Sequence, residues 1–452
     1  MSQDTFSPTP ERPWNNLGNN LGNNQADNHW GEPCPTGLKW LFLDLNSYFA
    51  SVEQQERPYL RGRPTAVVPM ETDSTCAIAA SYEAKAYGVK TGTKIYEAKR
   101  LCPHLQCVLA RHDIYVKYHH KIISAIAKHL PINKIWSIDE LSSRLPPGRR
   151  SENAARDIAI RTKQQIWEDV GPAINCSIGV APNSFLAKIA TDLQKPDGLV
   201  LLRRQDLPGP LFELDLMDLP GINTNMLARL ERGGIRTVEH LWNIPAKQAR
   251  AIWGGVQGER FWYNLHGYEV PDLETKNSVI GHSRVLDPDM RAPEKARQMA
   301  RRLTVKACQR LRRKEFFAGA FVLSIRTIDG RKWAAEVRLD PASDNTSFLE
   351  LLDDLWGMMI AECRPERLKK VAVTLHKLRK KEDLTGDLFA QTDPAITKKR
   401  NRRHALSDAM DSLNQKFGSE VVSLGIPPKT VAGYIGTKIA FSRVPDAAEF
   451  NE

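Results

Sequence analysis

The sequence predicts a multidomain α/β (α+β) protein, and three observations lead to that fold class. The chain has 452 residues, enough for about two to four domains. Strand-like and helix-like segments alternate up to about residue 200, and a second alternating unit begins at Ser278. Between them, residues 206–266 read as short helices broken by Gly and Pro. A hydrophobic fraction of 41% and a charged fraction of 26% exclude collagen-like, coiled-coil and wholly disordered chains.

The segment that opens the chain predicts neither a membrane anchor nor a secretory signal. Residues 1–36 contain the Asn-rich repeat NNLGNNLGNN without helical or strand periodicity, which is typical of a disordered leader. They lack a basic and an apolar signal region, and no run approaches the roughly 18 apolar residues that span a bilayer. Seven scattered cysteines without a C-x-x-C pair argue against disulfides and structural zinc. We therefore expect a cytoplasmic protein.

The first alternating stretch begins with LKWLFLDL, a compact apolar run that is typical of a buried strand. Further strands are expected at TAVVPM, AIAAS, KIWSIDE and INCSIGVA, and helices at SYEAKAYGV, IYEAKRL, YVKYHHKIISAIAKHL and residues 153–170.

The second alternating unit follows a polar linker, PDLETKNS. Its order is strand, long basic helix, two strands, helix and strand, and this βαββαβ pattern fits a ferredoxin-like domain. From about Lys381 the chain is charged and loop-rich, with one helix expected at NRRHALSDAMDSLNQKF.

Carboxylates stand at the ends of two apolar runs. Asp44 ends W-L-F-L-D, and Asp139 and Glu140 end I-W-S-I-D-E. If these strands are neighbours in one sheet, the carboxylates emerge at the same edge, where two hard divalent cations would relieve their repulsion. Such a pair of ions serves in-line nucleotidyl transfer. The alternative, on spacing alone, is that a strand ends in Asp or Glu because a loop begins there.

Positive charge concentrates in the long helix of the second unit. The chain carries 64 Lys and Arg against 53 Asp and Glu, a net charge of +11. Residues 291–315 hold ten Lys or Arg and two Glu, with the packed stripe Met299, Leu303, Ala307 and Leu311. Another face of the same helix carries Arg302, Lys306 and Arg310. A charged helix face is usually only solvated, but this single-signed bias fits contact with DNA phosphates.

Four sequence blocks occur here in an order that resembles the Y-family translesion DNA polymerases of the bacterial, error-prone lesion-bypass type. They are LFLDLNSYFASVEQQERPYLRGRPTAVVP, SYEAKAYGVKTGTKIYEAKRLCP, SIDE and CSIGVAPNSFLAKIATDLQKPDGLVLL. The resemblance extends from about residue 38 to 382. It implies a right-hand polymerase with a ferredoxin-like palm, small fingers, a helical thumb with a helix-hairpin-helix and a βαββαβ little finger. The implied boundaries are leader 1–36, palm 37–48 and 108–199, fingers 49–107, thumb 200–268, linker 269–276, little finger 277–382 and tail 383–452.

The resemblance also implies roles for individual residues of the active site. Asp44, Asp139 and Glu140 would bind two Mg²⁺ ions, with the main-chain carbonyl of Leu45 as a further ligand. Phe49 matches the steric gate, whose ring would collide with a ribose 2′-hydroxyl. Three further residues match those that hold the incoming dNTP: Tyr82, Lys85 and Lys195. Many members carry Arg where this chain has Lys85, and Lys supplies a point charge rather than a fork of donors.

Partners follow from the same resemblance. The turn L-P-G-I at 219–222 resembles a helix-hairpin-helix, in which main-chain N–H groups around Gly221 would hold a phosphate of primer-template DNA. The segment L-T-G-D-L-F at 384–389 resembles the peptides with which bacterial polymerases bind the sliding clamp, through Leu388 and Phe389. It departs from them in having Thr385 where a Gln is usual, and the alternative is that the Leu-Phe pair packs against the little finger.

The sequence thus predicts template-directed addition of dNTPs to a primer 3′ end by two-metal-ion nucleotidyl transfer. One competing hypothesis is a non-catalytic DNA-binding accessory protein with a polymerase-like fold, against which the three intact carboxylates argue. Another is a nucleotide cyclase with a similar carboxylate pair, against which the thumb-like and basic C-terminal segments argue.

Overall fold

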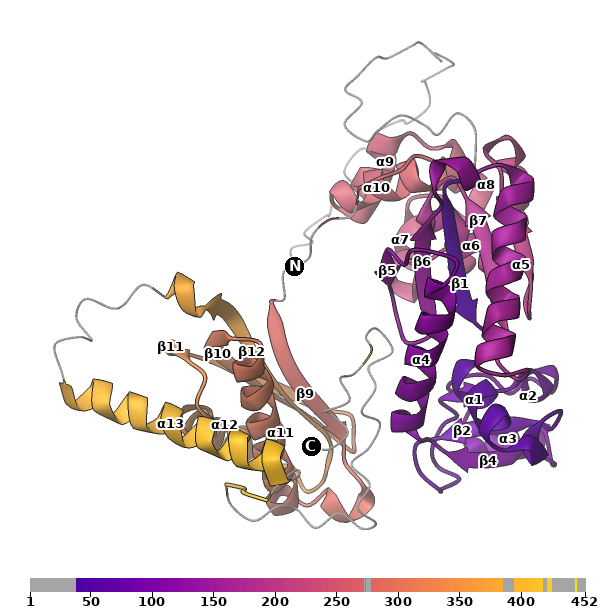
Figure 1. The fold of residues 1–452 in the computed structure, drawn as a ribbon. Coiled ribbons are helices and arrows are strands. Elements are labelled where there is room, and N and C mark those ends of the chain that lie inside the picture. Colours follow the sequence, from indigo (N-terminus) through magenta and orange to yellow (C-terminus); the bar gives the residue numbers. More distant parts are fainter. Residues whose placement is uncertain are drawn as a thin grey trace, which may run out of the picture. The chain divides into compact units, whose positions relative to one another are not determined.

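The structure is a computed structural model that describes residues 38–271, 273, 278–384, 394–417, 421–424 and 444 (Figure 1). The leader expected at 1–36 and the pair Leu388 and Phe389 lie outside these residues. Residues 204–271 form one compact unit, and the other described residues belong to a second. In the described part of the chain, no helix is both long and apolar enough to cross a membrane.

The N-terminal part, residues 38–203, is built on a sheet with the strand order β5-β6-β1-β7-β8. The central strand β1 (Trp40–Leu45) pairs antiparallel with β6 and β7, and β8 runs parallel to β7. The other elements of this sheet layer are β5 (Lys134–Ile135), β6 (Glu140–Arg144), β7 (Cys176–Ala181), β8 (Leu199–Leu201), α4 (His112–Ala127), α5 (Glu152–Asp169) and α6 (Ser184–Leu193).

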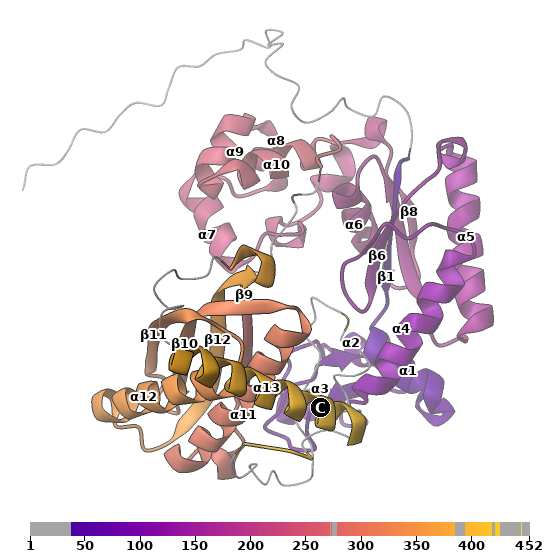
Figure 2. The same ribbon diagram turned by 60° about the vertical axis from the view of Figure 1, so that its left-hand side comes forward.

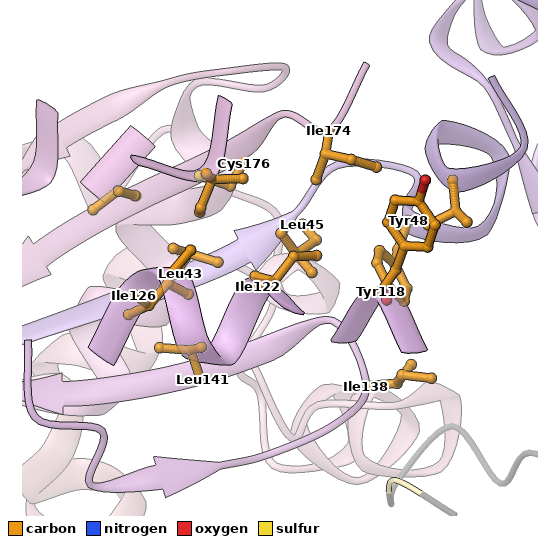
Figure 3. Packing of buried hydrophobic residues seen from close by; sticks show 14 of the residues in the cluster. Leu43, Leu45, Tyr48, Tyr118, Ile122, Ile126, Ile138, Leu141, Ile174 and Cys176 are labelled. Carbon is orange, nitrogen blue, oxygen red and sulfur yellow. The ribbon is translucent and has the colours of Figure 1, made fainter. Parts of the chain in front are cut away.

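Side chains alternate along β1, so successive residues point to opposite faces of this sheet. Leu43 and Leu45 face α4, where Ile122 and Ile126 pack against them (Figure 3). Asp44 therefore points to the opposite face, which α6 covers. Gly179 of β7 lets α6 approach, since a Cβ there would lie 2.1 Å from the carbonyl oxygen of Ala187.

A smaller sheet follows β1 and the helix α1 (Tyr48–Glu56), with the strand order β3-β2-β4. Its core is a separate apolar cluster that includes Val68, Ala84 and Ile95. The elements are β2 (Thr65–Val68), β3 (Ala79–Ala80), β4 (Gln106–Leu109), α2 (Tyr82–Ala86) and α3 (Ile95–Leu101).

The compact unit of residues 204–271 is helical. It contains α7 (Thr224–Arg232), α8 (Val238–Asn243), α9 (Ala246–Trp253) and α10 (Val256–Leu265). The ring of His266 stacks between Trp242 and Trp262, with centroid distances of 4.0 and 3.8 Å, and this triple stack fixes the end of α10 on α8.

The C-terminal part has the expected βαββαβ order and a sheet arranged β11-β10-β12-β9. Helix α11 packs on β12 and β9, while α12 packs on β10 and β11, so both helices cover one face of the sheet. Its elements are β9 (Val279–Val285), α11 (Pro293–Arg313), β10 (Phe316–Thr327), β11 (Lys332–Ala342), α12 (Asn345–Cys363) and β12 (Leu368–Lys380).

The helix expected in the tail is longer than the sequence indicated and docks on this C-terminal part (Figure 2). It is α13 (Pro394–Phe417). Arg312 at the end of α11 binds both carboxylate oxygens of Asp411, at 2.7 and 2.9 Å. The hydroxyl of Ser407 accepts a hydrogen bond from the main-chain N–H of Asn345. Part of the positive excess of α11 is therefore neutralised inside this domain.

Candidate active site

The carboxylates at the edge of the N-terminal sheet come together, although not by two strand ends as the sequence suggested. β5 stops at Ile135, and Glu140 is the first residue of β6 rather than the last of its strand. β1 and β6 are antiparallel, so the end of one lies beside the start of the other, and Asp44 faces Glu140 in register. Asp139 lies in the turn between β5 and β6, where its carbonyl accepts a hydrogen bond from Leu45 N–H at 2.9 Å.

An ammonium group joins the two paired carboxylates. Lys188 of α6 places Nζ 2.5 Å from Oδ2 of Asp44 and 2.7 Å from Oε1 of Glu140. It also lies 3.6 Å from Asp192, one helical turn further along. Lys188 was not predicted from the sequence, although a lysine inside the apolar run F-L-A-K-I-A indicates a buried lysine that pairs with a carboxylate.

Lys195 approaches Asp44 from a loop after α6. Its Nζ lies 2.9 Å from Oδ1 of Asp44 and 2.7 Å from Oδ1 of Asp192. The loop is held by the buried Asn46, whose Oδ1 accepts a hydrogen bond from the N–H of Asp197 at 2.8 Å. The structure thus brings the predicted Lys195 beside the predicted Asp44, and Asn46 is the link that the sequence did not indicate.

The electrostatics differ among the three acids. Burial raises the pKa of Asp44, but the attraction of Lys188 and Lys195 outweighs it and the net pKa lies below the usual value. Burial also raises the pKa of Glu140, the attraction of Lys188 opposes this, and repulsion by Asp44 and Asp139 adds to it, so the net pKa stays above the usual value. Asp44 is attracted by two ammonium groups, whereas Glu140 is attracted by Lys188 and repelled by two carboxylates, which gives the opposite signs.

Asp139 is fixed by its neighbours in the turn rather than by a lysine contact. The hydroxyl of Ser137 lies 2.5 Å from its Oδ1, and Nδ1 of the buried His119 lies 2.7 Å from the carbonyl oxygen of Ile138. Burial raises the pKa of Asp139, the Ser137 hydrogen bond opposes this, and repulsion by Asp44 adds to it. The net pKa of Asp139 is raised, so its surroundings disfavour the ionised carboxylate.

Tyr82 and Lys85 lie at the start of α2, with Nζ of Lys85 4.2 Å from the centre of the Tyr82 ring. Burial and the neighbouring ammonium of Lys195 lower the pKa of Lys85, while burial raises the pKa of Tyr82. Lys85 and Lys195 therefore repel each other across the site, and a polyanionic ligand bound to both would relieve this repulsion.

Phe49 lies in the first turn of α1, five residues after Asp44, and is 4% exposed. Its ring stacks on Tyr115 of α4 at 4.5 Å with an interplanar angle of 15°. The residue is packed on one side by an aromatic ring, as both the steric-gate and the core-packing interpretations require.

The acidic residues at this edge of the sheet are not arranged as a set of metal ligands. Within the described residues, no three or more Asp, Glu, His or Cys side chains are grouped as a metal site. The ammonium of Lys188 instead stands between Asp44 and Glu140. Since these carboxylates already share one cation at hydrogen-bond distance, their oxygen atoms fit a hard divalent ion, which prefers such ligands.

The residues predicted to contact DNA lie on separate elements. Gly221 is exposed, has a φ of +94°, and precedes α7, whose N-cap Asn223 accepts a hydrogen bond from Met226 N–H. Arg302, Lys306 and Arg310, which we call the α11 triad, are half-buried on α11. The sheet face that α11 and α12 leave uncovered carries a further set that we call the basic row. These are the exposed and laterally paired Arg326 of β10, Lys332 of β11 and Lys370 of β12.

Comparison with known proteins identifies the family. Residues 43–192 match the model of the impB/mucB/samB family, and residues 278–388 match that family's C-terminal domain. DNA polymerase IV of Moorella thermoacetica is 33% identical over 84% of this chain and 94% of the relative. DNA polymerase IV of Pelotomaculum thermopropionicum is 30% identical over 84% and 93%, respectively.

Solved structures agree with this assignment at the level of the fold. A Y-family DNA polymerase chimera of Dbh and Dpo4 matches with a TM-score of 0.64 at 22% identity, covering 76% of this chain and all of that one. An insertion ternary complex of Dbh DNA polymerase matches with a TM-score of 0.51. The right-hand polymerase fold expected from the sequence is confirmed, and the chain belongs to the impB/mucB/samB family of Y-family DNA polymerases.

Proposed function

We propose that this protein, a DNA-directed DNA polymerase of the translesion type, extends a primer through Asp44, Asp139 and Glu140 with two Mg²⁺ ions. A divalent metal requirement is general in the family. The observation that carries the residue assignment is that Asp44 and Glu140 hold a single cationic group between them, at 2.5 and 2.7 Å. A site that stabilises one cation between two carboxylates is suited to exchange it for another.

Asp139 and the main-chain carbonyl of Leu45 would complete the ligand set. Leu45 and Asp139 are joined by a main-chain hydrogen bond, which holds both residues at the end of β1 where Asp44 lies. A divalent ion held by these residues would supply charge neutralisation for the primer 3′-oxygen and the leaving pyrophosphate.

The remaining chemistry is positioning of the dNTP by this chain. Lys85 and Lys195 would hold the triphosphate from two sides, Tyr82 would donate its hydroxyl to a phosphate oxygen, and Phe49 would exclude a 2′-hydroxyl. In support, the charges of Lys85, Lys195 and Asp44 interact across one small region. Preorganised charges of this kind act mainly by orienting the reactants and stabilising the transition state.

Primer-template DNA would be held by the parts outside the catalytic sheet. We propose the palm, fingers, thumb and little finger at the boundaries stated above, with Gly221 and the α11 triad on phosphates. The basic row supports a second location for phosphate contact within the little finger, because its three cations are exposed and share one uncovered sheet face.

Primer extension with variants tests the assignment and separates it from a DNA-binding accessory role. Asp44→Ala, Asp139→Ala and Glu140→Ala should each reduce incorporation at least about 100-fold, the scale for losing a transition-state stabiliser, while DNA binding survives. Asp157→Ala is a matched control, since this exposed acid of α5 pairs only with Arg161 among the described contacts. Near-normal extension by folded Asp139→Ala would contradict the site.

We also propose a sliding-clamp contact through Leu388 and Phe389, and a cytoplasmic location, where bacterial DNA is replicated. The clamp contact would raise the effective concentration of the polymerase at the primer end. Titration of purified clamp with wild-type protein and the Leu388→Ala, Phe389→Ala double variant tests it. Equal binding by both would exclude this segment, and a loss of thermal stability in the variant would favour packing against the little finger.

A further inference from the structure

The ring behind Phe49 is held more firmly than packing requires. Tyr115 of α4 is completely buried, and its hydroxyl donates a hydrogen bond to Oε1 of Glu53 at 2.8 Å. Glu53 lies one helical turn after Phe49 on α1, so Tyr115 contacts α1 twice, once by its ring and once by its hydroxyl. Its main-chain carbonyl also accepts a hydrogen bond from the hydroxyl of Tyr48 at 2.6 Å.

Glu53 is in turn fixed by a charge network. Its carboxylate is fully buried and accepts two hydrogen bonds from Arg111, at 3.1 and 2.8 Å, with Arg57 3.6 Å away. A buried ion pair of this kind contributes little net stability, because desolvation offsets the attraction. What it does provide is a single orientation for the groups that it binds, in this case the hydroxyl of Tyr115.

Burial and the adjacent Glu53 carboxylate raise the pKa of Tyr115 far above its usual value. The phenol therefore remains protonated and keeps donating to Glu53. Phe49 consequently rests on a ring that cannot move away from α1 without breaking this hydrogen bond. An apolar side chain of similar volume would fill the same space without this constraint.

We propose that Tyr115 is a specificity-determining positioning residue that backs the steric gate, fixing how far the Phe49 ring stands from the sugar of the incoming nucleotide. This inference rests on the proposed role of Phe49 as the gate. It goes beyond that role by assigning part of the sugar selectivity to a residue that touches neither substrate nor metal. The energy that resists displacement of Phe49 is bounded by the aromatic pair, which corresponds to about a 2- to 13-fold factor in an equilibrium.

The test measures the ratio of dNTP to rNTP incorporation efficiency on one primer-template for Phe49→Ala, Tyr115→Leu, Tyr115→Phe and the Phe49→Ala, Tyr115→Leu double variant. Tyr115→Leu should lower the ratio by about 2- to 13-fold, mainly through faster rNTP incorporation. Tyr115→Phe keeps the stacked ring but loses the hydrogen bond to Glu53, so its ratio should fall between those of the wild type and Tyr115→Leu. In the Phe49→Ala background, Tyr115→Leu should add nothing, because the ring that it supports is gone.

The outcomes separate the two assignments. An unchanged ratio in Phe49→Ala would reject the gate itself, whereas a changed ratio in Phe49→Ala with an unchanged ratio in folded Tyr115→Leu would reject the backing role alone. Additive effects in the double variant would also overturn it. Circular dichroism and thermal melting check folding, and Tyr115→Met replaces Tyr115→Leu if the latter does not fold, since methionine adapts to irregular space.

Discussion

Replacing Lys188 with methionine removes the cation that Asp44 and Glu140 share while keeping the length and apolar stem of the side chain. Glu140 then loses its ammonium contact at 2.7 Å, and Asp44 retains Lys195 at 2.9 Å. The two carboxylates face each other in register on adjacent strands, so their repulsion is no longer compensated. We expect the variant to be less stable than the wild type when divalent cations are chelated.

The magnitude follows from the contacts. A hydrogen bond to a charged group contributes about 1.5–3 kcal/mol, and Lys188 makes two short ones. Its side chain is 19% exposed, so solvent screening and the recovered desolvation of the lysine reduce the sum to about 2–3 kcal/mol. For a folded body of about 150–250 residues, a loss of this free energy lowers the melting temperature by about 4–12 °C.

Thermal melting with EDTA and with increasing Mg²⁺ measures both the loss and its recovery. If Mg²⁺ binds between Asp44 and Glu140 as proposed, it must displace Lys188 in the wild type but not in the variant, so the difference in melting temperature between the two proteins should narrow as the Mg²⁺ concentration rises. Lys163→Met is the matched control, because Lys163 has the same 19% exposure but pairs with Asp197. A constant difference between Lys188→Met and wild type at all Mg²⁺ concentrations would refute a shared cation site.

Further predictions concern sugar choice, pH and DNA. Phe49→Ala should admit ribonucleotides, seen as a lower dNTP/rNTP ratio with dNTP incorporation retained. The raised pKa of Asp139 adds stability below its usual value of 3.8 that is lost as pH rises through the folded-state pKa. Asp139→Asn should therefore raise the free energy of unfolding by about 0.5–2 kcal/mol near neutral pH with Mg²⁺ chelated, and much less near pH 4, in denaturant titrations. Charge reversal of the α11 triad should weaken binding of all DNA sequences alike and should reduce the slope of log binding constant against log salt concentration by nearly one unit per lost phosphate contact. The same reversal of the basic row shows which of the two surfaces contributes more to DNA binding. A loss of binding confined to one DNA sequence would instead indicate base readout.

The strands and helices could be predicted because their apolar residues repeat with clear periods. LKWLFLDL gave a buried strand, and the βαββαβ order of the C-terminal part followed from segments of ordinary length. The strand proposed for KIWSIDE was misplaced because a strand and a tight turn of mixed residues look alike over seven positions. In the structure the chain turns at 136–139 and the polar segment ELSSR forms β6, whose Ser142 and Ser143 are buried.

Contacts between segments that lie far apart in the chain could not be predicted from the sequence. Nothing in the spacing connects Asn46 to Asp197, or Arg312 to Asp411, because these pairs form only when separate elements dock. The basic helix α11 illustrates the same limit. Counting charges overstated the basicity of α11, since Arg297 and Arg301 pair with Asp353 of α12 and Arg312 pairs with α13.

The charge balance of the site has a consequence for the order of binding. Lys188, Lys195 and Lys85 surround the carboxylates, so the acidic edge is nearly compensated by this chain's own cations. A lone divalent ion would have to compete with Lys188 for the same two oxygen atoms. If two ions arrive with a triphosphate, as proposed, they bring almost no net charge, and the phosphates would give Lys195 and Lys85 new partners as the carboxylates receive theirs. The lysines therefore favour joint binding of metal and nucleotide over metal alone, and the affinity for Mg²⁺ should rise when a non-hydrolysable dNTP is present.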